Sequence, residues 1–377
     1  MDLDFTEEQD MLRNLVRSLV DDVAPLTVVR ELEDDPVGYS TALWAQLAEL
    51  DLIGLTLPEE YGGSGMSMIE GAVVYEELGR GLAPTPHFVS AVLGAGVLLR
   101  LGTDAQRTAI LPGVAKGETI LTPAWLEPEN GFSAKGVQVR AVADGDGYVI
   151  DGTKRHVAFA SSAQKLVVLA RTGDAETDIG VFLVDRDADG VSLEQSFSIA
   201  SDTQYEVTFT GVRVGPEAVV GGPGAATEGW DAWTEVMHDG VILLAAYAVG
   251  GTQYALDITT QYAKDRKQFD KPLGAFQAIA HYLADGISAV DGAETLVYEA
   301  AWARSEGRDV KRLAPMAKLF AGKTYRDVTA VGQQVFGGVG FTLEYDIQLY
   351  FRRAKQFQLS WWNDRYLEEL IAADVLD

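Results

Sequence analysis

The chain has 377 residues, of which 47% are hydrophobic and 23% charged, a composition typical of a soluble globular protein with two or three packed units. Its formal net charge of −26 argues against nucleic-acid binding, because so acidic a chain repels a phosphate backbone. Cysteine is absent, which excludes disulfides and thiolate metal sites, and no metal site is expected.

The sequence predicts neither export nor a membrane span. The first ten residues, MDLDFTEEQD, are acidic and lack the apolar region of a secretory signal. No apolar run approaches the roughly 18 residues that cross a bilayer. We therefore expect a cytoplasmic protein.

Residues 1–117 predict an N-terminal helical domain. Thr6 is placed to cap a first helix and Gln9 to complete a capping box, and apolar residues then recur at helical spacing. Gly and Pro clusters separate the later helices. These helices are predicted over Tyr39–Leu50, Ser67–Leu78 and Thr85–Leu101.

Residues 118–225 change to short runs in which Val, Ile, Thr and Phe alternate with polar residues. The pairs Asp144-Gly145 and Asp151-Gly152 are typical of turns between strands. The pattern predicts a central antiparallel β-domain. Its strands are expected over Gln138–Ala143, Gly147–Ile150, Leu166–Ala170, Gly180–Val184 and Tyr205–Val214.

Residues 226–377 return to long helical segments that suit an up-down bundle of four helices. They are expected over Trp230–Asp265, Phe276–Glu306 and Val310–Phe336, with a C-terminal pair after Glu344. Because helices, strands and helices follow one another in blocks, the fold class is α+β with segregated layers.

Four segments, in this order, carry a resemblance to a known family. They are Leu57–Gly65 (LPEEYGGSG), Gly152–Lys154 (GTK), Tyr262–Gln277 with the run YAKDRKQF, and Gln334–Tyr345 with the run QVFGGVGF. Together they resemble the acyl-CoA dehydrogenases, from about residue 4 to residue 372. One such motif would be weak evidence, whereas four at family spacing are specific.

The resemblance implies a fold, a cofactor and a reaction. The fold is an N-terminal helical domain, a central β-domain and a C-terminal four-helix bundle, in subunits that pair tightly into dimers and tetramers. The cofactor is FAD and the substrates are acyl-CoA thioesters. A glutamate removes the proton α to the thioester, and the flavin N5 accepts the hydride from the β carbon.

The position of the usual catalytic glutamate is occupied here by Trp361, and the glycine after it by Trp362. Some family members place the base on a long bundle helix, and that position is Gly240. Indole can donate but cannot accept a proton, so no catalytic base is assigned. Asp239, one residue away, and Glu235 remain as alternatives.

The residues that resemble the flavin-ring motif also depart from the family pattern. A stretch that reads Thr-Glu-Pro-x-x-Gly-Ser-Asp in the family begins here with Leu126 and has Phe132 in place of the serine. The next strand has His156-Val157-Ala158 where the family brings a hydroxyl. His156 could donate a hydrogen bond, although a structural role is favoured. We expect the apolar side chains to fill the ring cavity.

The other half of the cofactor site matches the family. The resemblance implies that six residues reach across a dimer interface to the pyrophosphate and adenosine of the neighbour's FAD: Arg266, Phe269, Gln277, Gln334, Gly337 and Gly338. A guanidinium pairs with phosphate oxygens, and glycines let backbone N–H groups approach an anion.

These observations favour a subunit of a heteromeric (α2β2) acyl-CoA dehydrogenase, resembling the non-catalytic subunit of actinobacterial enzymes that oxidise steroid side-chain CoA thioesters. A homologous catalytic subunit would hold most of the acyl-CoA, with an electron-transferring flavoprotein as acceptor. The alternatives are a self-sufficient homo-oligomer that uses Asp239 or Glu235 and a flavin-free scaffold. A DNA-associated relative of the fold is disfavoured by the charge.

Overall fold

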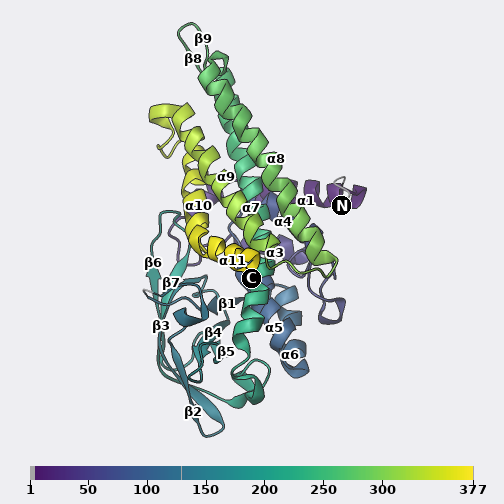
Figure 1. The fold of residues 1–377 in the computed structure, drawn as a ribbon, viewed down its shortest axis with the longest axis vertical. Helices are drawn as coiled ribbons and strands as arrows, with labels where there is room; N and C mark the ends of the chain where they lie inside the picture. Colours follow the sequence, from purple (N-terminus) through teal and green to yellow (C-terminus); the bar gives the residue numbers. More distant parts are fainter. Residues whose placement is uncertain (1–4, 129, 377) are drawn as a thin grey trace. The chain divides into compact units, whose positions relative to one another are not determined.

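The computed structural model describes residues 5–128 and 130–376 (Figure 1). Two compact units share the chain. The first comprises the described parts of Met1–Arg30, Ser67–Ala83 and Val241–Asp377, and the second comprises Glu31–Met66 and Pro84–Gly240. Each unit is built from segments distant in sequence.

The first unit begins with α1 (Glu7–Val23), whose start is the capping box predicted at Thr6 and Gln9. The helix α2 (Leu26–Glu31) follows at the unit boundary, and α4 (Met68–Arg80) begins with a second capping box at Ser67 and Glu70. Because the cap side chains bind the first backbone N–H groups, these helix starts are determined locally.

The long helices of the first unit agree with the prediction. They are α7 (Gly229–Asp265, whose first residues belong to the second unit), α8 (Gln277–Ser305), α9 (Leu313–Phe336), α10 (Ile347–Leu359) and α11 (Asp364–Leu376). The helix α9 packs against α8, α10 and α11 and carries much of the buried surface. The helix α9 begins at Leu313, three residues after the predicted start at Val310.

The helix α7 corrects one expectation from the sequence. By length and composition it is apolar enough to cross a membrane, but 72% of its most apolar window is buried inside the protein. A helix in a protein core and a helix in a membrane both have apolar surroundings, so both are apolar on all sides. The apolar composition of α7 is therefore weak evidence for a membrane span.

The second unit is built on a seven-stranded sheet in the order β1-β4-β2-β3-β7-β6, with β5 paired to β4. The strands are β1 (Leu121–Ala124), β2 (Arg140–Asp144), β3 (Gly147–Ala158), β4 (Lys165–Arg171), β5 (Ile179–Asp185), β6 (Val191–Ser196) and β7 (Gln204–Val214). The five predicted strands are present, and β1 and β6 are additional. Most pairs are antiparallel, but β1 runs parallel to β4 from Leu121 opposite Lys165.

Three helical segments complete the second unit. They are α3 (Thr41–Glu49), a π-helix η2 (Phe88–Gly94) continued by α5 (Ala95–Leu101), and α6 (Asp104–Ala115). The single helix predicted over residues 85–101 is therefore divided into π and α parts. Gly94 lies so close to β1 that a Cβ atom there would come within 2.5 Å of the Leu121 side chain.

Candidate functional site

Trp361 and Trp362 lie in the short connection between α10 and α11. Both have positive φ, 52° and 71°, a backbone conformation that bulky residues rarely adopt. The Trp362 side chain is buried and packs edge-on against Tyr366, with ring centroids 5.7 Å apart. Trp361 occupies the position where the family places its base. The side chain at that position is an indole, which offers only a donor.

Gly240 is in close contact with its surroundings. A Cβ atom there would lie 2.9 Å from the Leu93 side chain and 3.3 Å from the ring of Phe88, so a larger residue would have to displace them. The second family position for a base thus holds no side chain and little space for one.

The two alternative bases each have an ionisable neighbour. The carboxylate of Asp239 accepts a hydrogen bond from the guanidinium of Arg100 on α5. Glu235 lies one helical turn from His238, with 3.6 Å between its Oε1 atom and the imidazole Nδ1. Asp239 is therefore engaged in an ion pair with Arg100.

The flavin-ring motif forms a loop after β1 that a buried ion pair holds in place. The Oε1 atom of Glu127 accepts from Lys154 Nζ at 2.6 Å and from the backbone N–H groups of Gln138 and Val139 at 2.8 Å each. Burial lowers the pKa of Lys154 to about 8, against the opposing effect of Glu127. The roles of Glu127 and Lys154 were not predicted, although both lie in family-like motifs.

Phe132 belongs to an aromatic cluster at this loop. Its ring lies 5.8 Å from that of Trp125, which in turn lies 5.0 Å from Trp233 at the start of α7. Trp125 and Trp233 are buried. The substitution that removes a family hydroxyl thus adds a ring to a packed cluster.

His156 lies at an irregularity of β3, where the pairing with β7 shifts register between Lys154 and Val157. Its φ is 55°, and its Nδ1 atom is 2.5 Å from the side-chain oxygen of Gln204. Because an amide oxygen only accepts, Nδ1 is the protonated nitrogen in this pair. The carbonyl of Ala158 accepts from the Thr122 hydroxyl at 2.6 Å.

Three of the six predicted cofactor-binding residues gather at one tip of the bundle. A hairpin of β8 (Lys267–Gln268) and β9 (Lys271–Pro272) joins α7 to α8, as Figure 1 shows. Arg266 directly precedes β8, Phe269 lies in the turn between the two strands, and Gln277 begins α8. All three are exposed, and Phe269 is 85% exposed. Such an exposed ring suits contact with another molecule.

The other three predicted residues lie where α9 ends. Gln334, Gly337 and Gly338 are exposed, and a Cβ atom at either glycine would meet nothing within 4 Å. The ring of Phe336 stacks on that of Tyr262, near the end of α7, with centroids 4.1 Å apart. This stack brings the α9 turn to the end of α7 from which the hairpin starts.

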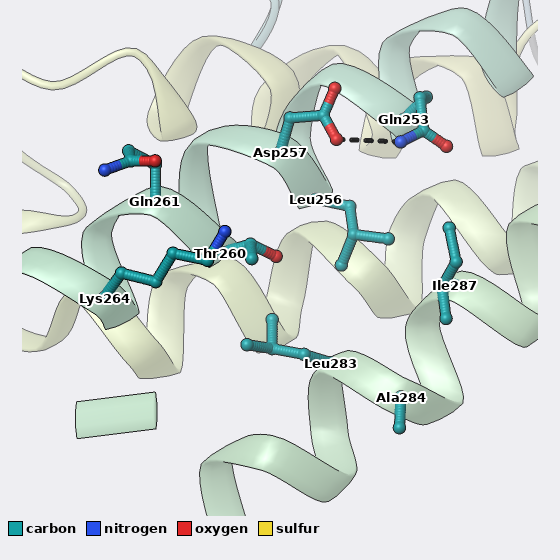
Figure 2. Close-up of a pocket in the computed structure, with 9 residues that line it drawn as sticks. All are labelled: Gln253, Leu256, Asp257, Thr260, Gln261, Lys264, Leu283, Ala284 and Ile287. Atoms are coloured by element: carbon teal, nitrogen blue, oxygen red, sulfur yellow. Dashed lines mark hydrogen bonds between the residues drawn. The ribbon is translucent and has the colours of Figure 1, made fainter. Parts of the chain in front are cut away.

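A groove of about 530 Å³ lies between α7 and α8 in the first unit (Figure 2). Figure 2 shows Leu256, Leu283 and Ile287 on its apolar side and a hydrogen bond from Gln253 to Asp257 on its polar side. None of the predicted site residues lines it. Among the described residues, no group of His, Asp and Glu is arranged to hold a metal ion.

Family models match nearly the whole chain: the acyl-CoA dehydrogenase N-terminal domain over residues 6–118, the middle domain over 123–212 and the C-terminal domain over 227–375. The chain belongs to the acyl-CoA dehydrogenase family. A probable acyl-CoA dehydrogenase of Bacillus subtilis, YngJ, is 33% identical over the full length of both chains.

Solved structures of acyl-CoA dehydrogenases agree with this fold. The ChsE4-ChsE5 complex of Mycobacterium tuberculosis contains a chain that matches with a TM-score of 0.90 and 28% identity, over 100% of this chain and 99% of that one. A Tcur3481-Tcur3483 steroid ACAD matches with a TM-score of 0.86 and 32% identity, over 98% and 99%.

The acyl-CoA dehydrogenases are FAD-dependent flavoproteins, and the two halves of this chain's motif set fit that cofactor unequally. At the bundle tip, the exposed guanidinium of Arg266 and the open backbone at Gly337 and Gly338 suit an anionic pyrophosphate. In the ring motif, Leu126, Phe132 and Ala158 offer no side-chain donor to a flavin.

Proposed function

We propose that this acyl-CoA dehydrogenase is the non-catalytic subunit of an α2β2 enzyme that introduces an α,β double bond into acyl-CoA thioesters. The observation that carries the proposal is the tryptophan pair at positions 361 and 362, with the indole of Trp362 buried. A homologous partner subunit supplies the catalytic base and binds most of the acyl-CoA. When bound, FAD supplies the hydride acceptor.

Exposure of the predicted adenosine-side residues supports a role across an interface. Arg266, Phe269 and Gln277 on the hairpin side and the glycine turn after α9 are open to solvent in the single chain. In the proposed complex, Arg266 pairs with the pyrophosphate of the partner's FAD, and Phe269 contacts its adenosine. The chain thereby completes a cofactor site whose ring half belongs to the partner.

The ring motif of this chain supports the same division. Phe132 stands in the cluster with Trp125 and Trp233, and Leu126 and Ala158 replace hydroxyl-bearing residues of the family pattern. Large buried aromatic side chains remove roughly 150–250 Å² each from water, which favours a filled cavity over an open one. We infer that this chain's own ring cavity holds side chains rather than flavin.

Comparisons with other proteins support a heteromer and suggest a substrate class. The ChsE4-ChsE5 structure is described as a complex, and the Tcur3481-Tcur3483 protein as a steroid ACAD. By that analogy we propose steroid side-chain CoA thioesters as the substrate class, an electron-transferring flavoprotein as acceptor and a cytoplasmic location. We further propose that the chain has three domains, with boundaries after residues 117 and 225.

The experiment is flavin stoichiometry with native mass, for the chain alone and co-expressed with a homologous acyl-CoA dehydrogenase subunit from the same genome. The proposal expects a lone chain without flavin and an α2β2 species with one FAD per αβ pair. A lone homo-oligomer with one FAD per chain and activity would contradict it and return attention to Asp239 and Glu235. Absence of flavin in both preparations would indicate a scaffold.

A further inference from the structure

Lys318 is a buried lysine in the second turn of α9, and the residue is 1% exposed. Its Nζ atom donates to the carbonyl oxygen of Trp362 at 2.9 Å and to that of Phe357 at 3.1 Å. The ammonium also lies over the ring of Phe357, 4.4 Å from its centroid. One side chain thus binds both the last turn of α10 and the connection between α10 and α11.

That connection is short and strained. The helix α10 is capped by Ser360, whose N–H donates to the Gln356 carbonyl, and α11 is preceded by Asn363, whose side chain accepts from the N–H of Tyr366. Trp361 and Trp362 lie between these two caps in the left-handed conformation. Non-glycine residues hold that conformation only where surrounding contacts impose it.

A buried lysine with only two carbonyl partners is unfavourable for stability alone. Burial lowers its pKa to about 7, while the carboxylate of Asp364 at the start of α11 acts in the opposite direction. An apolar residue of the same length would pack against Phe357 without the desolvation penalty. An apolar side chain would, however, leave the carbonyls of Phe357 and Trp362 without the hydrogen bonds that the ammonium donates, and these bonds are what Lys318 contributes to the conformation of the segment.

We infer that Lys318 is a positioning residue that holds the Trp361–Trp362 segment in its left-handed conformation and so keeps the Trp362 indole buried directly after Trp361, the position of the family's catalytic base. The inference deepens the proposed function, because it names the contact that maintains the tryptophan pair. It does not depend on which subunit holds the flavin.

The test uses the full chain, in the oligomer in which it purifies, labelled with 5-fluorotryptophan. The chain has seven tryptophans, and Trp361→Phe and Trp362→Phe assign the two resonances of interest. In Lys318→Met we expect the fluorine chemical shifts of Trp361 and Trp362 to move toward the value of a solvent-exposed tryptophan. The chemical shifts of the other five tryptophans should not change. Amide exchange over residues 360–363 should rise at least tenfold.

Two controls separate positioning from general loss of stability. Lys323→Met removes an exposed lysine of the same helix that pairs with Glu368, and Val328→Ala lowers stability in the core beside Leu256 and Val290. Neither should change the Trp361 or Trp362 resonance. Unchanged resonances in folded Lys318→Met, or equal changes in Val328→Ala, would overturn the inference.

A second comparison remains decisive where Lys318→Met alone does not fold. Glycine adopts the left-handed conformation without strain, so Trp362→Gly should reduce the need for the lysine. We expect Lys318→Met to lower Tm much less in the Trp362→Gly background than in the wild type. An equal drop in both backgrounds, or failure of both to fold, would make Lys318 a general core residue. A flavin result that contradicts the proposed function leaves this outcome unaffected.

Discussion

The ring of Tyr262 stacks on that of Phe336, with centroids 4.1 Å apart and planes 16° from parallel. Tyr262 lies four residues before Arg266 on α7, and Phe336 directly precedes Gly337 at the end of α9. The contact therefore holds two motifs distant in sequence at one end of the bundle. It is the structural basis for our proposal that both motifs belong to one cofactor-binding surface.

The first prediction concerns Arg266. Arg266→Ala in the co-expressed complex should weaken flavin retention about 10- to 100-fold, because a charge-assisted hydrogen bond contributes about 1.5–3 kcal/mol. Flavin release on dilution, followed by fluorescence, measures the effect. Lys264→Ala, which removes an exposed cation two residues away, should change retention little. Equal retention in wild type and Arg266→Ala would argue for a flavin-free scaffold.

The second prediction concerns Trp361. Trp361→Glu should not restore turnover in the isolated chain, because the ring motif still carries Leu126, Phe132 and Ala158. Acyl-CoA oxidation with an artificial electron acceptor is the measurement, and flavin absorbance shows whether cofactor has entered. Clear activity from this single change would refute the filled-cavity account.

The third prediction concerns pH and His87. This residue directly precedes η2 and is buried, with its Nε2 atom 3.2 Å from the Leu52 carbonyl. Burial lowers its pKa from 6.5 to about 4. Between pH 4 and pH 6.5, His87 is therefore protonated in the unfolded chain and neutral in the folded chain. The free energy of unfolding is therefore independent of His87 titration above about pH 6.5. As the pH falls from 6.5 toward 4, it decreases by up to about 1.4 kcal/mol per pH unit.

Chemical denaturation between pH 7 and pH 4 measures that dependence. His87→Gln should remove part of the slope, whereas His281→Gln, at an exposed position on α8, should leave it as in the wild type. If the two variants show the same slope, the acid sensitivity comes from other groups.

The fourth prediction concerns Tyr298, which joins α8 to α4 and α1. Its hydroxyl donates to Glu76 at 2.6 Å and accepts from Arg13 at 3.1 Å, and Arg13 also pairs with Glu76 at 2.8 Å. Tyr298→Phe should lower the free energy of unfolding by about 1–3 kcal/mol, because buried Glu76 loses a donor.

Tyr282→Phe provides the matched control on the same helix. Tyr282 is 46% exposed, and substitutions at such positions usually change stability by less than about 0.5 kcal/mol. Thermal or urea unfolding compares the two variants directly. Equal stability of both would show that the hydroxyl of Tyr298 contributes nothing net to the network.

Some features of the fold are decided by local chemistry, and these could be predicted. The capping box at Thr6 and Gln9 involves residues three apart, so its hydrogen bonds depend on the local chain alone. The same holds for the long helices of the bundle and for strands whose apolar alternation is clear. The family motifs likewise identified the candidate site positions without coordinates.

Other features depend on contacts between segments distant in sequence. The four residues of β1 carry too little periodicity to predict a strand, and their parallel pairing with β4 follows from where the chain returns. The division of residues 85–101 into π and α parts occurs where Gly94 approaches Leu121. Neither can be predicted from a local window, because the deciding partner lies outside it.

By itself, the sequence determined the residue types at each predicted site position: an indole where a carboxylate is usual in the family, and an arginine and glycines where the resemblance implies an anion site. Only the tertiary structure decided what those residues contact. Lys318 lies in an ordinary helical run, and its burial beneath the Trp362 carbonyl depends on how α9, α10 and α11 pack. Side-chain chemistry is local, whereas burial and hydrogen-bond partners are set by the packing of distant segments.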